Sequence, residues 1–359
     1  MSDVVTEVRG EAGLITLNRP KALNALSLDM IRALTSALLA WRDDPKVKRV
    51  GIRGTGKEGA FGAFCAGGDI RFFHQAVLAG DPRLEDFFTE EYTLNHLIHA
   101  YPKPYVVFMD GIVMGGGMGI SAHGGAGSLR IATDRTKMAM PETNIGLFPD
   151  VGGGWFLAHC PGHIGEYLAL TGHLINGRDA HAAGLADGIL PAAEIQSAWD
   201  ALQAQEDFAR LRTRVLQVPD ADGELARLRP QIDRFFGLPT VAAIVTALEA
   251  DPSEWATTTA GMLRKRSPLM LHVTLEHLRL ARHMTLADDL RMERDMIRHC
   301  FHLRPGPASE TFEGIRALAI DKDHAPRWNP VRIEDVTPAM VEAFFTSSWP
   351  GHAHPLRHL

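Results

Sequence analysis

The sequence predicts an α/β protein of two domains, with strands concentrated in its first part and helices in its second. Residues 4–52 are expected to follow the order strand, strand, helix, strand. From about residue 195, runs of β-branched residues become rare while Leu, Ala, Arg and Glu increase. At 359 residues and 45% hydrophobic, the chain can fill two cores. We expect residues 1–200 to carry the active centre and residues 201–359 to form a helical domain that covers it.

The composition argues against several classes of partner and location. A formal net charge of −6 provides no electrostatic footprint for nucleic acid or an anionic membrane, although a local basic patch can still hold a phosphorylated ligand. Cys65, Cys160 and Cys300 are odd in number and unevenly spaced, which predicts neither disulfides nor a thiolate metal site. The first residues lack a leader pattern, and no apolar run approaches the roughly 20 residues of a membrane helix. We therefore expect a cytoplasmic protein with no nucleic-acid or membrane partner.

Local signals predict the individual elements. Residues 4–8 and 14–18 flank a glycine-bearing loop, which predicts a hairpin. Ser27 is a candidate N-cap for a helix whose apolar residues recur at helical spacing as far as Trp41. Further strands are expected at residues 47–52, 103–109 and 129–132, and short helices at 164–170 and 180–186. In the second half we expect helices near residues 223–228, 240–250, 253–265, 269–283, 286–301, 309–320 and 338–345.

Two glycine-rich turns predict a site for developing negative charge. The strand at residues 103–109 leads to Met114-Gly-Gly-Gly-Met-Gly119, and Phe64-Cys-Ala-Gly-Gly-Asp-Ile70 repeats this arrangement before a helix expected from Asp69. Successive glycines favour close backbone approach. If residues 114–122 are helical, the amides at the start of that helix suit an oxygen that becomes negative during a reaction. The two turns are expected to converge.

Two carboxylates lie in the next stretch of the chain. Glu142 follows Pro141, eight residues before Asp150, and both lie between glycine clusters. Two acids beside an anion site can act as a base and its orienting partner, although capping of a solvated loop is the competing interpretation. Glycines 152–154 alone predict a tight turn. Glu91 alone is most simply a solvated position on a helix.

Other catalytic patterns are absent. His123 occupies the place of the last glycine of a nucleophile elbow, so Ser121 is expected to be a packed residue. A dinucleotide-binding reading requires G-x-G-x-x-G, but Ile120 stands where the third glycine is needed. Three histidines of the second half lack the i,i+4 spacing of a helical metal site: His272, His277 and His283.

Four motifs in order resemble the crotonase (enoyl-CoA hydratase/isomerase) superfamily. They are Leu17-Asn-Arg-Pro-Lys-Ala-Leu-Asn-Ala-Leu26, the two glycine turns quoted above, and Met140-Pro-Glu-Thr143. Three more segments resemble its 3-hydroxyisobutyryl-CoA hydrolase subfamily: Glu90-Glu-Tyr92, Ile145-Gly-Leu-Phe-Pro-Asp-Val-Gly-Gly-Gly154 and Asp321-Lys-Asp-His-Ala-Pro-Arg-Trp-Asn-Pro330. The resemblance implies a ClpP-like spiral of β-β-α units in two roughly perpendicular sheets, with a C-terminal helical region that allows a homo-oligomer.

The resemblance also implies roles for particular residues. The amides of Gly68 and Gly116 would form an oxyanion hole for a thioester carbonyl. The CoA channel would be lined mainly by main-chain atoms of Lys21, Ala22, Leu23 and Ala66. An acyl-CoA is the implied substrate; because CoA is part of that substrate, no separate cofactor and no metal are expected.

One departure from the family pattern decides between activities. Enoyl-CoA hydratases carry a second glutamate where this chain has Gly119, so a two-Glu hydratase is not expected. The hydrolase pattern implies that Glu142 and Asp150 are catalytic, and that Glu91 binds substrate together with Gly116 and these two acids. The implied reaction is hydrolysis of a short branched 3-hydroxyacyl-CoA thioester, in valine catabolism. A single-Glu hydratase or isomerase, and an acyl-CoA-binding scaffold, are the alternatives.

Overall fold

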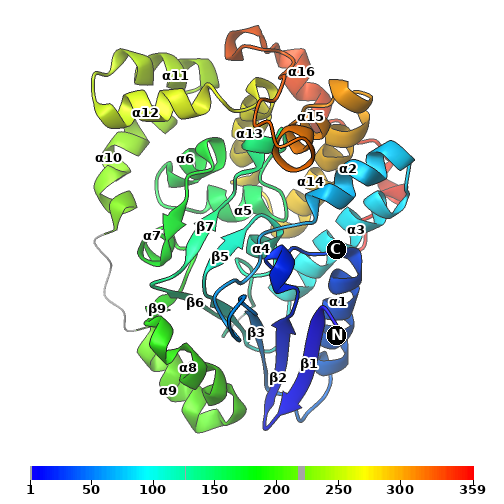
Figure 1. Ribbon diagram of the computed structural model, residues 1–359, viewed down its shortest axis with the longest axis vertical. Helices are drawn as coiled ribbons and strands as arrows, with labels where there is room; N and C mark the ends of the chain where they lie inside the picture. Colours follow the sequence, from blue (N-terminus) through cyan, green and yellow to red (C-terminus); the bar gives the residue numbers. More distant parts are fainter. Residues whose placement is uncertain (1, 126, 217–222) are drawn as a thin grey trace. The chain divides into compact units, whose positions relative to one another are not determined.

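Figure 1 shows a computed structural model of the chain, which describes residues 2–125, 127–216 and 223–359. Contacts divide the chain into two compact units, each assembled from three separate segments. The first unit contains Met1–Gly68, Thr93–Ala139 and Leu174–Arg227, and the second contains Asp69–Tyr92, Met140–His173 and Leu228–Leu359. A domain boundary near residue 200 stays a prediction, because interleaved segments do not test a division along the sequence.

The first unit contains two sheets. A six-stranded sheet has the order β1-β2-β3-β4-β6-β9, and a three-stranded sheet has the order β5-β7-β8 (Figure 1). The strands of the larger sheet are β1 Val4–Arg9, β2 Ala12–Leu17, β3 Arg49–Gly54, β4 Tyr105–Met109, β6 Leu129–Thr133 and β9 Gly188–Leu190. Those of the smaller sheet are β5 Ile112–Met114, β7 Lys137–Ala139 and β8 Ile175–Asn176. The predicted β1–β2 hairpin is confirmed as antiparallel, and the other pairs of the larger sheet are parallel.

Buried strands and the helices packed against them form the core of this unit. Every residue of β4 is buried, as expected for a central parallel strand covered on both faces. Helix α1, Leu28–Arg42, begins at Ser27, whose hydroxyl accepts the amide hydrogen of Met30, and it buries the apolar face that its spacing predicts. The unit also contains α4 Gly116–Gly119, α7 Gly177–Ala182, α8 Ile195–Asp200 and α9 Gln205–Leu216.

All the regular secondary-structure elements in the described residues of the second unit are helices. Helix α13, Pro268–Ala281, buries most of its residues and packs against α5, Gly153–Ala158, and α6, Ile164–Thr171. The remaining α-helices of this half are α2 Ile70–Ala79, α11 Val241–Ala250, α12 Glu254–Leu263, α14 Leu286–His302, α15 Glu310–Ile315 and α16 Pro338–Glu342. Two further helices pass from one unit to the other along the chain: α3 Arg83–His99 and α10 Glu224–Phe236. The predicted change from strands to helices along the chain is therefore confirmed.

Three sequence expectations need correction. The helix expected over residues 114–122 is only four residues long, because α4 is three parts glycine, the poorest helix former after proline. The helix expected at 180–186 begins earlier, where the Asn176 side chain caps α7, and Gly184 with φ +76° follows its end. Helix α10 continues through Pro230, which the sequence suggested as a break.

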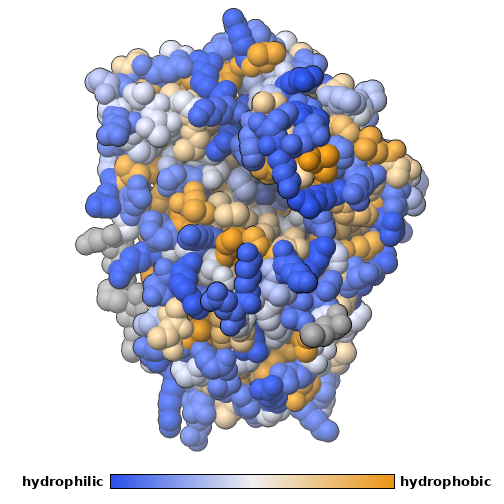
Figure 2. Space-filling view, in the orientation of Figure 1, coloured by the Kyte–Doolittle hydropathy of each residue, from blue (hydrophilic) through white to orange (hydrophobic). Residues whose placement is uncertain are grey.

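A helix needs both length and apolar residues to span a membrane. No helix among residues 2–125, 127–216 and 223–359 is long and apolar enough to cross a bilayer. The face drawn in Figure 2 is covered mainly by hydrophilic residues, with apolar residues in small groups. Scattered apolar groups of this kind are normal for a folded protein.

Candidate active site

The two glycine turns of the first unit lie beside each other, as the sequence predicts. Cys65 and Val113 form a parallel β-bridge, and the Met114 amide donates to the Cys65 carbonyl over 3.0 Å. Gly67 has φ +105°, and a Cβ atom there would lie 3.3 Å from the Met114 carbonyl oxygen and 3.6 Å from the Gly116 nitrogen. Side chains at these positions would separate the two turns, which explains the need for glycine.

The start of α4 presents backbone amides close to this contact. Gly115 precedes the helix with φ +49° and ψ −123°, a conformation that requires glycine. The Gly116 N–H belongs to the first turn of a helix, where amides have no carbonyl partner within the helix. Gly117 packs tightly, since an added Cβ would lie 2.3 Å from the Cys65 carbonyl oxygen. The geometry therefore suits the oxyanion role that the resemblance implies for Gly116, which stays a prediction, as does that of Gly68.

The residues expected at the CoA channel meet in the same unit. Lys21 and Ala22 belong to the short 3₁₀ helix Pro20–Ala22, and Leu23 follows it with φ +51°. The Leu23 carbonyl accepts the Ala66 amide over 3.0 Å. This bond ties the first motif to the glycine turn that contains Ala66. Their contact with CoA stays a prediction.

Three of the acidic side chains buried in the second unit are those named by the family resemblance, and we call them the acid cluster: Glu91, Glu142 and Asp150. The Tyr92 hydroxyl donates to Asp150 Oδ2 over 2.8 Å. Within the described part of the chain, Glu91 Oε1 and Glu142 Oε2 have no hydrogen-bond partner. Unpartnered buried oxygens are costly, so each needs an explanation, and a bound substrate provides one.

The solvated position expected for Glu91 is wrong. Its side chain is 2% exposed, because this part of α3 also buries Phe87, Phe88 and Tyr92. A pair of adjacent glutamates, Glu90 and Glu91, does not reveal in sequence which one faces inward. The family resemblance, which implies a substrate contact for Glu91, agrees better with this burial than the residue pattern did.

The pKa of each acid in the cluster is raised above its ordinary value. Burial, and then the charge of Asp150, raise the pKa of Glu91 and of Glu142 well above the usual value. Burial likewise raises the pKa of Asp150 to about 6, against the opposing effects of the Tyr92 hydrogen bond, its own backbone amide and His277. Buried acids whose pKa is raised by burial and by a neighbouring carboxylate are typical of catalytic sites.

The turn that carries Glu142 is held on several sides. Glu142 opens the 3₁₀ helix Glu142–Ile145, which ends at Gly146 with φ +68°. The Thr143 hydroxyl donates to the Leu170 carbonyl over 3.1 Å, and the Arg266 guanidinium donates to Asn144 Oδ1 over 2.8 Å. These bonds fix the backbone on either side of the acid, so its position is preorganised.

A second group of buried ionisable residues was missed by sequence reasoning. Asp289 and Glu293 on α14 and His277 on α13 are fully buried, and we call them the clamp. His277 Nε2 lies 2.9 Å from Asp289 Oδ1 and 3.4 Å from Glu293 Oε1. The signal available in the sequence was that both acids share the apolar face of α14 with Leu290 and Ile297.

The donor set of the clamp fits backbone amides better than a metal ion. Its three ligand atoms lie within 4.8 Å of one another. The Gly152 and Gly154 amides, however, donate to Glu293 over 2.7 and 3.2 Å, and the Trp155 amide donates to Asp289 over 2.8 Å. N–H dipoles that already point at these oxygens would repel a cation.

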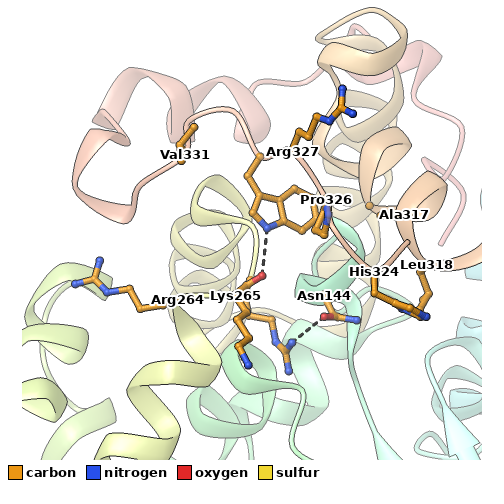
Figure 3. Close-up of a pocket in the computed structure, with 12 residues that line it drawn as sticks. Asn144, Arg264, Lys265, Ala317, Leu318, His324, Pro326, Arg327 and Val331 are labelled. Atoms are coloured by element: carbon orange, nitrogen blue, oxygen red, sulfur yellow. Dashed lines mark hydrogen bonds between the residues drawn. The ribbon is translucent and has the colours of Figure 1, made fainter. Parts of the chain in front are cut away.

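A basic pocket of about 490 Å³ also lies in the second unit (Figure 3). Its cationic residues come from the end of α12 and from the segment after α15: Arg264, Lys265, Arg266 and Arg327. Figure 3 shows Arg264 and Arg327 extending in different directions, and the dashed line at Asn144 marks the hydrogen bond that its Oδ1 accepts from Arg266. None of the three cluster acids lines this pocket, so it is separate from the candidate catalytic groups. Binding of a phosphorylated ligand there stays a prediction.

Comparisons with known proteins agree with the resemblance seen in the motifs. The family model described as enoyl-CoA hydratase/isomerase matches residues 12–345. The chain is 42% identical over 347 residues to the 3-hydroxyisobutyryl-CoA hydrolase, mitochondrial, of Xenopus tropicalis, covering 94% of this chain and 87% of that protein. It is 40% identical over 362 residues to the 3-hydroxyisobutyryl-CoA hydrolase 1 of Arabidopsis thaliana, covering 96% and 91%.

A solved structure extends the comparison to the fold. The crystal structure of a carnitinyl-CoA dehydratase from Mycobacterium thermoresistibile superposes with a TM-score of 0.89 and is 40% identical, covering 98% of each chain. The predicted fold class, a crotonase-type α/β fold with a helical C-terminal region, is therefore confirmed. The chain belongs to the enoyl-CoA hydratase/isomerase family.

Proposed function

We propose that this protein hydrolyses a short branched 3-hydroxyacyl-CoA thioester, 3-hydroxyisobutyryl-CoA, to 3-hydroxyisobutyrate and CoA. The observation that carries the proposal is the acid cluster: three buried carboxyl groups with raised pKa, two of which have an oxygen with no hydrogen-bond partner in the described chain. The relatives from Xenopus and Arabidopsis, named for this hydrolase, support it over nearly their whole length. A role in valine breakdown is part of the proposal and follows from the family resemblance alone.

The glycine amides supply the electrostatic part of the mechanism. We assign the thioester carbonyl oxygen to the N–H groups of Gly68 and Gly116. As the carbonyl carbon becomes tetrahedral, this oxygen gains negative charge, and each donor stabilises the transition state by about 2.7 to 4 kcal/mol, as in other oxyanion holes. Backbone donors need no reorganisation during the reaction, because the turns already hold them in place.

Glu142 acts as the nucleophile or as the general base, by one of two routes. In the first, its carboxylate attacks the carbonyl carbon, the carbon–sulfur bond breaks, CoA leaves as a thiolate that takes a proton, and water then cleaves the mixed anhydride. In the second, Glu142 accepts a proton from the attacking water. Both routes consume one water and yield one acid and one thiol. Both routes use the ionised form of Glu142, and its raised pKa makes that carboxylate a stronger base and nucleophile once it has lost its proton.

Asp150 and Glu91 bind the substrate hydroxyl in this proposal. Tyr92 orients Asp150 through its hydroxyl, and Glu91 Oε1 has an open acceptor position. A substrate hydroxyl would donate to one of these buried oxygens and remove the cost of leaving it unpaired. An ester without the hydroxyl leaves that cost in place, so a site of this kind discriminates strongly against it.

A second candidate function is a lyase that adds water to, or removes it from, an enoyl-CoA through Glu142 alone. The name of the dehydratase structure from Mycobacterium thermoresistibile favours it, since that protein is as similar in sequence as the hydrolases. Gly119 argues against it, because it leaves no carboxylate at the position of the second hydratase glutamate.

One assay separates the two functions. Thiol release is measured with a 3-hydroxyisobutyryl-CoA ester, the matching isobutyryl-CoA ester and the methacrylyl-CoA ester, while the absorbance of the enoyl conjugation is recorded. The hydrolase releases thiol from the hydroxy ester at least about a hundredfold faster than from the plain ester. Similar thiol release from both esters would remove the hydroxyl site from the proposal. A change in enoyl absorbance without thiol would establish the lyase instead.

The location and assembly of the enzyme remain separate predictions. The relative from Xenopus carries "mitochondrial" in its name, which leaves the cytoplasmic location expected from the sequence as a prediction for fractionation experiments. A homo-oligomer and the lack of a separate cofactor are likewise expected and are open to measurement by light scattering and by assay of the dialysed protein.

A further inference from the structure

The loop that follows Asp150 is held in an unfavourable backbone conformation. Val151 has φ +60° and Gly152 has φ +80°. A β-branched residue with a positive φ is a genuine outlier and costs on the order of 1–3 kcal/mol. Such a conformation persists only when surrounding contacts impose it, so the loop needs a specific restraint.

Two carboxylates on α14 provide that restraint. Glu293 accepts the Gly152 amide through Oε2 over 2.7 Å and the Gly154 amide through Oε1 over 3.2 Å. One helical turn earlier, Asp289 Oδ2 accepts the Trp155 amide over 2.8 Å. Three such bonds within four residues tie the loop to one face of α14.

His277 completes the arrangement from α13. Its Nε2 atom contacts both acids, at 2.9 Å for Asp289 and 3.4 Å for Glu293, and its side chain is fully buried. The ring also lies against the loop, because a Cβ atom at Gly154 would come within 2.1 Å of His277 Nε2. Glycine is therefore required at residue 154, and the imidazole closes the clamp around the loop.

The clamp acts on Asp150 through the backbone. The Gly153 amide donates to the Asp150 carbonyl over 2.8 Å, and Asp150 stands only two residues before the first clamped amide. The clamp and Asp150 also influence each other electrostatically. Burial first, then the charges of Asp289 and Asp150, raise the pKa of Glu293. Neither Asp289 nor Glu293 belongs to the acid cluster, and this loop is the backbone connection between them and Asp150.

We infer that Glu293, with Asp289 and His277, is a positioning residue that sets the selectivity for the substrate β-hydroxyl by fixing the loop that places Asp150. The inference rests on the proposed function, in which Asp150 binds that hydroxyl. A small displacement of a binding carboxylate weakens a directed hydrogen bond strongly, whereas it barely affects an ester that lacks the hydroxyl.

The test uses Glu293→Gln in the full-length protein. Glutamine keeps the shape of the side chain and one of its two acceptor oxygens. Its NH₂ group takes the place of the other oxygen and cannot accept a hydrogen bond from the Gly152 or Gly154 amide that it faces. The measured quantity is the ratio of kcat/KM for 3-hydroxyisobutyryl-CoA to that for isobutyryl-CoA. We expect this ratio to fall about tenfold or more, with the plain ester cleaved within about twofold of wild type.

Two further variants control the result. Asp288→Asn changes an exposed acid on the same helix, beside Asp289, and should leave the ratio unchanged. Glu293→Asp restores two carboxylate oxygens on a shorter stem, so it should recover part of the ratio that glutamine loses. A purely structural role predicts no such difference between the two esters.

The outcomes are separable from those of the proposed function. If wild type itself shows no preference for the hydroxy ester, the proposed hydroxyl site fails, and the inference fails with it. If wild type discriminates but Glu293→Gln keeps the full ratio, or loses both activities equally, the inference alone is overturned. Should Glu293→Gln not fold, His277→Gln leaves both carboxylates in place; an unchanged ratio in that variant overturns the inference.

Discussion

Two groups of buried acids in the helical unit differ in what surrounds them. Asp289 and Glu293 of the clamp receive three backbone amides and a histidine. The acid cluster receives the Tyr92 hydroxyl on Asp150, with the backbone amides of Glu142 and Asp150 themselves as the other donors that lower their pKa. The side chains of both groups are buried. Burial alone therefore does not distinguish an acid that holds the structure from one that acts on substrate; the supply of donors does.

The difference has opposite energetic consequences. Replacing a clamp acid leaves amides unpaired, so it should destabilise the fold. Replacing a cluster acid removes a desolvated and poorly paired group, so it should cost activity and leave stability unchanged or improved. Catalytic sites commonly exchange stability for function in this way.

Glu142→Gln should show the largest effect on the cluster side of this comparison. The variant keeps the shape of the side chain but loses the base or nucleophile, so we expect kcat for thiol release to fall by roughly 10³-fold, while the ester still binds. Denaturant unfolding should give a free energy at least equal to that of wild type. Normal thiol release would remove Glu142 from the mechanism and erase the contrast between the groups.

Asp289→Ala should show the largest effect on the clamp side. The change removes the acceptor of the Trp155 amide and the nearer of the two acids that contact His277, and breaking a buried charged network of this kind costs about 3 to 4 kcal/mol in the free energy of unfolding. Asp288→Ala is the matched control, because that acid is 53% exposed and pairs with Arg291 at the surface, where about 1 kcal/mol or less is at stake. Equal losses in the two variants would show that the clamp has no special structural role.

The pH dependence of the free energy of unfolding offers a third test of the contrast between the two groups of acids. The pKa of Asp150 is about 6 in the folded protein, against an ordinary value of 3.8, mainly because of burial. Between these values the folded state binds more protons than the unfolded state, so the free energy of unfolding should fall as pH rises from about 4 to about 6. The shift corresponds to a loss on the order of 3 kcal/mol. Asp150→Asn should flatten this part of the curve; an unchanged slope would place the titration elsewhere.

The elements were predicted where their signals are local. Ser27 and Asp69 begin the helices expected from them, because a capping side chain and the amide that it accepts lie within three residues. The contact between the two glycine turns was also predictable, since glycine clusters have few other uses at a strand end. The motifs around Glu142 and Asp150 singled them out as candidate site residues, and the structure buries both side chains.

The clamp was not predicted, because its parts meet only through tertiary structure. Glu293 lies 141 residues from Gly152 in sequence, and no local pattern links a helix to a distant loop. His277 was judged by metal-ligand spacing along one helix, whereas its partners lie on the next helix. The burial of Glu91 depends equally on which face of α3 turns inward, which two adjacent glutamates do not encode.

Glu91→Gln should give the smallest of these effects and the finest test of the comparison. Burial and the nearby Asp150 raise the pKa of Glu91, so the folded protein resists its ionisation and loses stability as pH increases. Glutamine removes that penalty, and we expect a gain in the free energy of unfolding at pH 8 that shrinks towards pH 5. Glu90→Gln, at the neighbouring half-buried position, is the matched control and should change stability by less than about 0.5 kcal/mol at either pH. A loss of stability in Glu91→Gln that equals the loss in Asp289→Ala would mean that Glu91 is paired like a clamp acid, and it would leave no acceptor in the cluster for the substrate hydroxyl except Asp150.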